Sequence, residues 1–444
     1  MKRIFSLLLF LCFTTFAIAQ ETARPYVFSY FDNIHINTEF RPRFEFRDGY
    51  QNLSFASDQP TYHINQRSRI NADFKAEKLR FYTSIQDVRI WGEENTRATT
   101  GGLMVFETYI EPSIGKKSRL RIGRQVITLD AERLFARNDW RATAGKHDAI
   151  RHFYQSKGFE MQTAFAYNQN NAALNSGVFD PGFDTYLFLG LNHIKTTVFK
   201  NRLEIRLLNF ADAYQNPTNG AIYAKANTGG TFTYDFGPIK TKLEGYYQFG
   251  HINTGQQLTA YFLNPEVKTD LNRYELAIGA EFLSGTSNTN AGGISRSFLA
   301  QYGAFHQHNG RMDYTANAVR TYNHEGLGDL YFKQKYSIKS KFELKLETHA
   351  FATTSKQVDV TNKELSPFWG LECDARLIWK PNYYTAIEFA YMAMKATETR
   401  AALYGGNSNI IQQFAYIQAK FTPTLWSYHK NGVEIQEIQI TKDQ

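Results

Sequence analysis

Cysteine is almost absent from this chain. Only two occur among 444 residues, and Cys12 lies in the apolar N-terminal stretch, so Cys373 is the one cysteine expected in the mature protein. No internal disulfide can form from a single cysteine. An exported chain of this size must therefore be held together by other means.

Long apolar runs are also missing after the N-terminus. Lys2 and Arg3 precede an apolar run from Ile4 to Phe16 and an Ala17-Ile18-Ala19 cleavage pattern, which predicts a cleaved secretory signal peptide over residues 1–19. No later window contains 18 consecutive apolar residues, and this excludes helical membrane spans.

Recognisable catalytic motifs are also missing. No Ser-His-carboxylate arrangement stands out, and no phosphate loop or dinucleotide motif follows an expected strand. His306 and His308 lie close together without a nearby carboxylate or cysteine, so we favour solvated histidines over a metal site. We predict no catalytic residue, no metal, no cofactor and no nucleic-acid partner.

Aromatic residues and alternating strands are abundant. The chain has 15% aromatic residues, with 36 Phe and 27 Tyr, although its mean hydropathy is negative at −0.45. Leu120 and Ile122 alternate with Arg119 and Arg121, which places apolar and cationic side chains on opposite faces of one strand. A polar average with alternating strands is typical of a transmembrane β-barrel, in which half of each strand faces water.

Segments with this alternation number eighteen, and we predict an all-β, up-and-down antiparallel barrel over residues 35–421. The expected strands cover residues 35–47, 60–75, 78–91, 103–114, 117–128, 146–155, 158–169, 183–197, 201–212, 221–236, 239–251, 256–269, 272–285, 326–338, 340–354, 366–380, 382–396 and 409–421. Residues 20–34 are expected to form a periplasmic N-terminal segment, and residues 422–444 a polar C-terminal tail.

Short and long connections alternate along this pattern. The long ones cover residues 48–59, 92–102, 129–145, 170–182, 286–325, 355–365 and 397–408 and are rich in Gly, Asn, Ser, Thr and Asp. Outer-membrane barrels have short periplasmic turns and longer outer loops, and an even strand count places both termini in the periplasm. A soluble sandwich with Greek-key crossovers would not sort its connections in this way.

Arginine is concentrated early in the chain. Of the 24 arginines after the leader, 16 lie between Arg24 and Arg151. Charged residues at alternating positions should line the lumen, because Arg or Lys facing lipid at the bilayer midplane costs about 2–4 kcal/mol. In the later strands, Arg and Glu on neighbouring strands could simply pair and stiffen the wall. In the first five strands we expect unpaired positive potential.

The loop from Asp130 to Lys146 mixes arginines with carboxylates. It could fold into the mouth as a constriction, or remain a packed, ion-paired outer loop that does not contact solute. Which of the loops 129–145 and 286–325 would gate a pore is left open. The five tryptophans fit interface girdles, with a sugar-stacking platform as the alternative.

Several short motifs, in this order and spacing, resemble the alginate export family of outer-membrane β-barrel porins. They are Gln86 to Gly92, Gly123-Arg124-Gln125 followed by Asp130, Glu132 to Phe135 and Trp140, Phe282 to Gly285, Tyr302-Gly303, His306, Asn309-Gly310 and Met312 to Tyr314. The chain departs from the family pattern within Ser297 to His306 and in lacking a final aromatic strand residue. The resemblance implies an eighteen-stranded outer-membrane channel for an acidic polysaccharide such as alginate or related anionic sugars.

Arginine suits such a solute, since its guanidinium stays ionised and donates paired hydrogen bonds to carboxylates. We predict that ten basic residues line the lumen and bind solute: Arg41, Arg43, Arg67, Arg69, Arg89, Arg119, Arg121, Arg124, Arg133 and Arg151. The chain should be a passive, anion-preferring monomer in contact with outer-membrane lipid. A periplasmic export partner, a general small-solute porin, a lipid-modifying enzyme and an adhesive barrel remain alternatives.

Overall fold

The computed structural model describes residues 30–94, 102–169, 172, 186–216, 218–290, 292–318 and 321–430. The predicted signal peptide and most of the predicted N-terminal segment lie outside these residues. Within the described part, no helix has the length and apolar character needed to cross a membrane.

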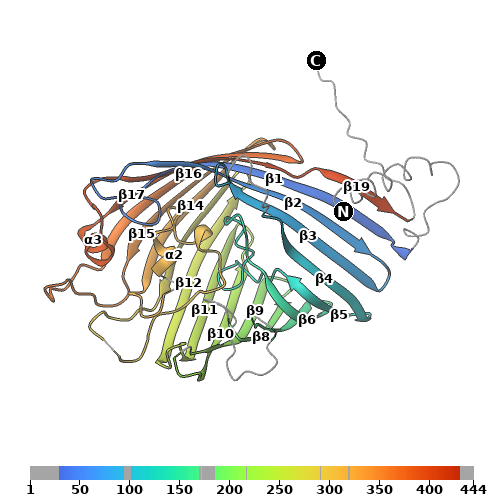
Figure 1. The fold of residues 1–444 in the computed structure, drawn as a ribbon, viewed down its shortest axis with the longest axis horizontal. Coiled ribbons are helices and arrows are strands. Elements are labelled where there is room, and N and C mark those ends of the chain that lie inside the picture. The colour runs from blue at the N-terminus through green and yellow to red at the C-terminus, as the bar shows by residue number, and fades with distance from the viewer. Residues whose placement is uncertain are drawn as a thin grey trace, which may run out of the picture.

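Nineteen strands form one antiparallel sheet (Figure 1). They are β1 Asn33–Asp48, β2 Thr61–Lys75, β3 Leu79–Ile90, β4 Met104–Gly115, β5 Ser118–Gln125, β6 His147–Ser156, β7 Phe159–Tyr167, β8 Phe188–Val198, β9 Leu203–Gln215, β10 Ile222–Asp235, β11 Ile239–His251, β12 Gln257–Leu271, β13 Tyr274–Leu283, β14 Leu327–Ile338, β15 Phe342–Ala352, β16 Phe368–Asn382, β17 Thr385–Ala396, β18 Gln412–Phe421 and β19 Thr424–His429.

The sheet closes on itself through β1. This strand pairs with β2 along one edge and with β18 and β19 along the other, while each remaining strand pairs with its sequence neighbours. Because β19 continues β18 along the same edge of β1 after Pro423, the two count as one interrupted strand of the barrel. The predicted eighteen-stranded barrel is confirmed, and closure removes every exposed sheet edge.

The predicted boundary of the C-terminal tail is wrong. Residues 422–444 were expected to be a polar tail, but Thr424–His429 pair with β1 beside Asn33 to Asn37. Pro423 has no backbone N–H and ends the alternating pattern, so the strand that follows it was not recognised. The barrel wall therefore extends to His429.

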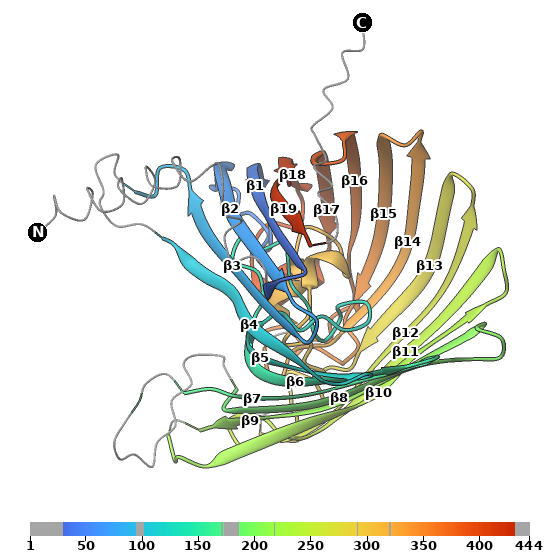
Figure 2. The ribbon, with the colours of Figure 1, turned by 90° about the vertical axis from the view of Figure 1, so that its right-hand side faces the viewer.

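Long loops gather at one end of the barrel and short turns at the other. In Figure 1, the helix α3 (Glu398–Tyr404) and the long loops lie at the left, whereas β19 lies at the right. The elements η2 (Phe305–Gln307) and α2 (Tyr314–Ala318) belong to the loop between β13 and β14, which runs inside the barrel in both ribbon views (Figure 2).

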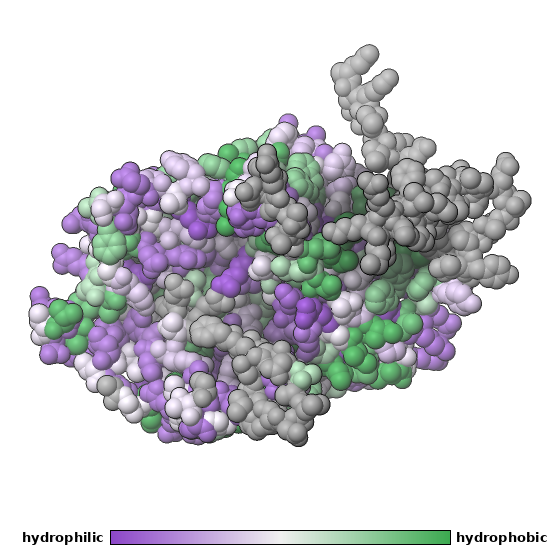
Figure 3. All heavy atoms as spheres, viewed as in Figure 1, coloured by the Kyte–Doolittle hydropathy of each residue, from purple (hydrophilic) through white to green (hydrophobic). Residues whose placement is uncertain are grey.

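The two faces of the wall differ as the alternation predicted. On β1, Phe40 and Phe44 are about two-fifths exposed, at 39% and 41%, whereas Glu39 and Glu45 on the other face are 8% and 0% exposed. Figure 3 shows apolar residues over the β3–β5 part of the outer surface and mainly polar residues at the long-loop end. An apolar exterior around a charged interior is the pattern of a barrel in lipid.

Candidate functional site: the lumen constriction

Two long loops fold into the lumen and bind each other. They are the loop between β5 and β6 (residues 126–146) and the loop between β13 and β14 (residues 284–326). Phe135 and Tyr302 form a parallel bridge, the Ala136 N–H donates to the Tyr302 carbonyl at 3.0 Å, and the Ala304 N–H donates to the Glu132 carbonyl at 3.0 Å. The two loops therefore act as one layer across the barrel.

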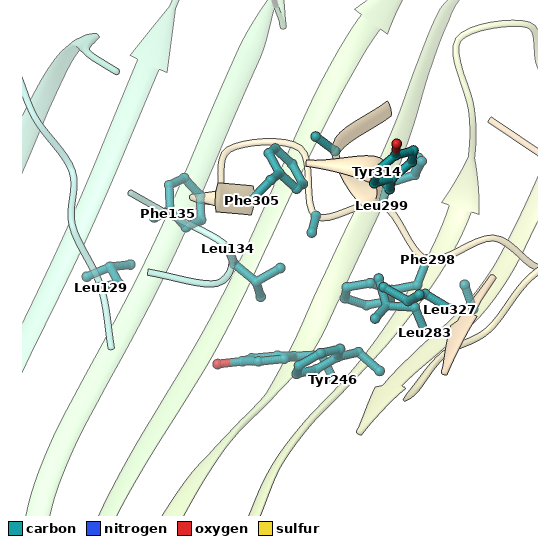
Figure 4. Close-up of a cluster of buried hydrophobic side chains, with 14 of the residues drawn as sticks. Leu129, Leu134, Phe135, Tyr246, Leu283, Phe298, Leu299, Phe305, Tyr314 and Leu327 are labelled. Atoms are coloured by element: carbon teal, nitrogen blue, oxygen red, sulfur yellow. The ribbon is translucent and has the colours of Figure 1, made fainter. Parts of the chain in front are cut away.

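Apolar packing holds this layer to one side of the wall. Phe135 packs edge-on against Phe210 of β9, and Phe298 stacks on Phe262 of β12 with ring centroids 5.5 Å apart. Figure 4 shows side chains of both loops meeting others from the barrel wall. Each fully buried apolar side chain contributes roughly 1.5–3 kcal/mol. Two cavities that remain in the lumen are lined by β1, β2 and β15–β18 as well as by the loops.

Buried polar contacts fix the same layer. Arg133 donates to Glu281 of β13, with both side chains almost completely buried. The Met312 N–H donates to the Glu372 carboxylate of β16 at 2.8 Å. Breaking a buried ion pair by removing one partner typically costs about 3–5 kcal/mol. These contacts make the loops part of the barrel interior.

Stacked planar groups join the two inward loops to β1. Trp140 and His306 stack face to face, with ring centroids 3.6 Å apart and planes 6° apart, and the Arg43 guanidinium lies 3.4 Å from the Trp140 ring. The Trp140 N–H donates to the Tyr50 hydroxyl at 3.2 Å, and His306 Nδ1 lies 3.0 Å from the Asp313 carboxylate. Burial lowers the pKa of His306 although Asp313 opposes the shift. The ring is therefore neutral near pH 7.

One cavity lies on each side of this stack. The inner cavity, of about 380 Å³, reaches the short-turn side and is lined by Arg41, Glu132, Arg137, Asn138, Asp139, Trp140, Ala304, His306, Gln307, Arg311, Lys345, Arg376, Glu388, Tyr416 and Gln418. The outer cavity, of about 340 Å³, is lined by Arg43, Arg47, Tyr50, Gln51, Asn65, Asn138, Trp140, Arg141, Ala142, Thr143, Phe305, His306, Asp313 and Ala316. Trp140 and His306 are common to both.

Both cavities have more basic than acidic side chains. The inner one is lined by five Arg or Lys residues and three carboxylates, and the outer one by three arginines and one carboxylate. The Nε of Arg311 makes no hydrogen bond among the described residues and lies 3.6 Å from the Glu347 carboxylate. Because Arg311 also lines the inner cavity, its guanidinium can attract a carboxylate solute there.

Eight of the ten predicted arginines lie in the barrel interior: Arg41, Arg43, Arg67, Arg69, Arg119, Arg121, Arg133 and Arg151. Most are ion-paired in the described part of the chain, contrary to the expected shortage of carboxylates. Asp139 contributes most to this difference, because it lies in the inward loop and contacts both Arg41 and Arg67. Burial would raise the pKa of Asp139, but these two arginines hold it well below its usual value.

Arg69 and Arg151 are the exceptions within the described residues. Arg69 donates to the Gln86 amide oxygen at 3.0 Å and lies 3.9 Å from the Phe106 ring, and Arg151 lies 4.7 Å from the Phe153 ring. Neither contacts a carboxylate. Their charges are not neutralised locally and raise the positive potential of the lumen.

Arg89 and Arg124 were wrongly assigned to the lumen. On β3, Arg89 shares its face with Ile85, which is 37% exposed, and donates to Asp87. On β5, Arg124 lies on the outward face and donates to the exposed Asp148 at 2.9 Å. Both were chosen for their motifs, although the two-residue period of each strand directs them outward. Their positions near the long-loop end let these ion pairs face headgroups instead of acyl chains.

Several lining residues were not predicted. Arg311, Arg376 and Glu388 border the inner cavity, and the Trp140–His306 stack divides the lumen. The alternation on β16 and β17 could have identified Arg376 and Glu388, because both lie opposite outward apolar residues. The stack joins residues that are far apart in the sequence, and no local pattern reveals it. The expectation that His306 is solvated is wrong, since its side chain is buried.

Three solved structures show what this fold is similar to. The outer membrane protein OpdK from Pseudomonas aeruginosa is 10% identical, with a TM-score of 0.58 over 90% of this chain and 100% of that chain. OpdL from the same organism is 12% identical, with a TM-score of 0.60 over 88% and 99% of the two chains. OccK8 (OprE), also from that organism, is 9% identical, with a TM-score of 0.59 over 89% and 100%.

At such identities the similarity shows the fold alone. No family model matches the chain, and no curated protein sequence matches it. The resemblance to the alginate export family therefore stays a prediction. The closed wall, its apolar exterior and these neighbours together show an eighteen-stranded antiparallel β-barrel of the outer membrane.

Proposed function

We propose that this barrel is a passive, anion-preferring channel and that its solutes are small carboxylates, such as acidic sugars. The observation that carries the proposal is the pair of basic cavities in series on either side of the Trp140–His306 stack. Fixed positive charge in a low-dielectric passage concentrates anions and excludes cations. No chemical step is assigned to the chain.

A basic path continues from the cavities to the short-turn mouth. A third cavity there, of about 530 Å³, is lined by Lys341, Lys380 and Lys420 together with the turn between β16 and β17. Lys380 pairs with Glu343, and Lys420 lies 3.5 Å from Glu39, so the charge is partly compensated. Many weak basic contacts favour passage over retention, because a single tight site would trap the solute.

The size of the cavities favours a small solute over a polysaccharide chain. Volumes of 340 to 380 Å³ lie at the small end of the range for ligand pockets. The Trp140–His306 stack lines both cavities, and an extended polymer would have to pass the two inward loops that occupy the lumen. OpdK has been solved with vanillate, a small aromatic carboxylate. A small organic anion is therefore our choice over intact alginate.

Liposome swelling tests this function with matched solutes. Vesicles containing the barrel should admit glucuronate faster than glucose, which has nearly the same size but no charge. The variant Arg311→Gln should lower the glucuronate rate severalfold and leave the glucose rate unchanged, since only the anion is attracted by the positive charge of Arg311 beside the inner cavity. Equal rates for the two sugars would indicate a general diffusion porin. Impermeability to both sugars would contradict a channel for small solutes.

A further inference from the structure

The short turns carry exposed cations that the pore does not use. Among the described residues, nine basic side chains on six of these turns are exposed and make no ion pair. We call this set the short-turn rim: Lys78, Lys116, Lys117, Lys157, Lys200, Arg202, Arg273, Lys339 and Lys341. Lys341 also lines the cavity at the short-turn mouth, whereas the others line none of the three basic cavities. Their charge requires another explanation.

Outward-facing apolar residues lie next to these cations. Ile114 precedes Lys116 by two positions and is 58% exposed, and Phe199 adjoins Lys200 and is 69% exposed. Other members of the outward rows lie beside the remaining cations: Leu79, Leu271 and Ile338. An apolar side chain followed by a cation suits the boundary between acyl chains and phosphate groups. A surface that met only a water-soluble partner would not need this apolar row.

Two of the lysines occupy positions where glycine or asparagine is usual. Lys200 has φ +58° and Lys339 has φ +55°, both in the left-handed region. Lysine in this region costs backbone energy that glycine would avoid. The turns therefore keep a cation where the backbone alone favours a different residue.

The opposite rim has fewer such cations. Among the described residues at the long-loop end outside the inward loop 126–146, Arg296, Lys363 and Lys395 are exposed and make no ion pair. Exposed, unpaired cations are thus in excess at the end with short turns, which by their length are the periplasmic ones. A sided distribution of charge matches a membrane whose two leaflets differ in headgroup.

We propose that the short-turn rim binds the phosphate headgroups of anionic phospholipids in the periplasmic leaflet. The apolar neighbours enter the acyl-chain boundary, and the lysines and arginines of the rim reach the phosphates. Each Lys or Arg near an anionic membrane surface contributes about 1 kcal/mol, which corresponds to a factor of about five in binding per residue. The contact holds the barrel at a fixed depth and does not depend on which solute it conducts.

Native mass spectrometry of the full barrel in mixed micelles tests the proposal. The micelles contain equal amounts of phosphatidylglycerol and phosphatidylcholine, and the retained lipids are counted. The wild type should retain phosphatidylglycerol severalfold over phosphatidylcholine. The double variants Lys116→Gln/Lys117→Gln and Lys339→Gln/Lys341→Gln should each lower this ratio at least threefold. The matched control Lys356→Gln/Lys363→Gln, on an outer loop, should leave the ratio unchanged.

Folding is checked by heat-modifiable migration on gels, which all variants should retain because the substituted side chains are exposed. Equal retention of the two lipids by the wild type would overturn the proposal, as would equal loss in the control. Binding of soluble polyglutamate to the detergent-solubilised wild type and short-turn variants is measured as well, to distinguish an acidic protein partner from lipid. If the short-turn variants lost polyglutamate binding and kept the lipid ratio, the rim would instead be a docking surface for an acidic periplasmic protein.

Discussion

Neutralising Arg67 should release the inward loop, whereas neutralising Arg69 should not. The two arginines lie two residues apart on the same face of β2, and both are almost completely buried. Arg67 donates to Glu39 at 2.7 Å and to Asp139 of the inward loop at 2.7 Å. Arg69 contacts Gln86 and no carboxylate in the described chain.

The contacts of the two arginines give the relative free-energy costs of the two substitutions. Arg67→Gln leaves Glu39 with Lys420 at 3.5 Å and Arg41 at 4.0 Å, and leaves Asp139 with Arg41 at 3.3 Å. Removing one partner of a buried pair costs about 3–5 kcal/mol. Arg69→Gln removes two hydrogen bonds to one neutral amide oxygen and leaves no carboxylate unpaired, a loss of about 1.5–3 kcal/mol. The sequence alone predicts only that Arg67 lines the lumen and binds solute. The observed contacts predict a structural effect first.

Single-channel recording and trypsin digestion distinguish the two variants. In Arg67→Gln the current should become noisy with larger open steps, and trypsin should cut after Arg137 or Arg141 faster than in the wild type. Arg69→Gln should keep quiet currents and a protected loop, with a reduced anion preference. The reasoning would be refuted if both variants gated alike, or if the loop of Arg67→Gln stayed as resistant to trypsin as that of the wild type.

Further expectations follow from the same geometry. Trp140→Ala should join the two cavities and raise single-channel conductance without unfolding the barrel; unchanged conductance would show that the stack does not limit flow. Lowering the pH should loosen the stack, because burial holds the folded-state pKa of His306 below the usual 6.5. The neutral His306 ring therefore stabilises the folded stack above pH 6.5, and this stabilisation is lost as the pH falls through the lowered pKa. Current noise should rise on acidification in the wild type and not in His306→Gln. Neutralising Arg89 or Arg124 should leave the reversal potential unaltered, since both side chains face outward.

The strands of the wall were predictable from the sequence because one face of a barrel strand contacts lipid and the other contacts the aqueous lumen, so apolar and polar residues alternate. The expected strand 326–338 matches Leu327–Ile338, and the expected strand 103–114 matches Met104–Gly115. Alternation and short turns are local signals, so they fix the number of strands and the face of each side chain. The two outward arginines were misplaced because motif membership was given priority over this period.

The interior was not predictable in the same way. Asp139 meets Arg41 across 98 residues of sequence, and Phe135 meets Tyr302 across a longer separation. Loop residues have no regular period, and their partners are set by which apolar side chains fill the lumen. The sequence showed that the loop 130–146 was rich in opposite charges. It did not show that these charges would neutralise arginines of the wall.

The reversal potential in a potassium chloride gradient across a planar bilayer tests the central claim most directly. With basic residues in excess around both cavities, the potential should shift toward the chloride value. The shift should shrink at 1 M salt, where the Debye length falls to about 3 Å from about 10 Å at 0.1 M. A potential at zero, or one displaced toward the potassium value, would contradict an anion-preferring channel.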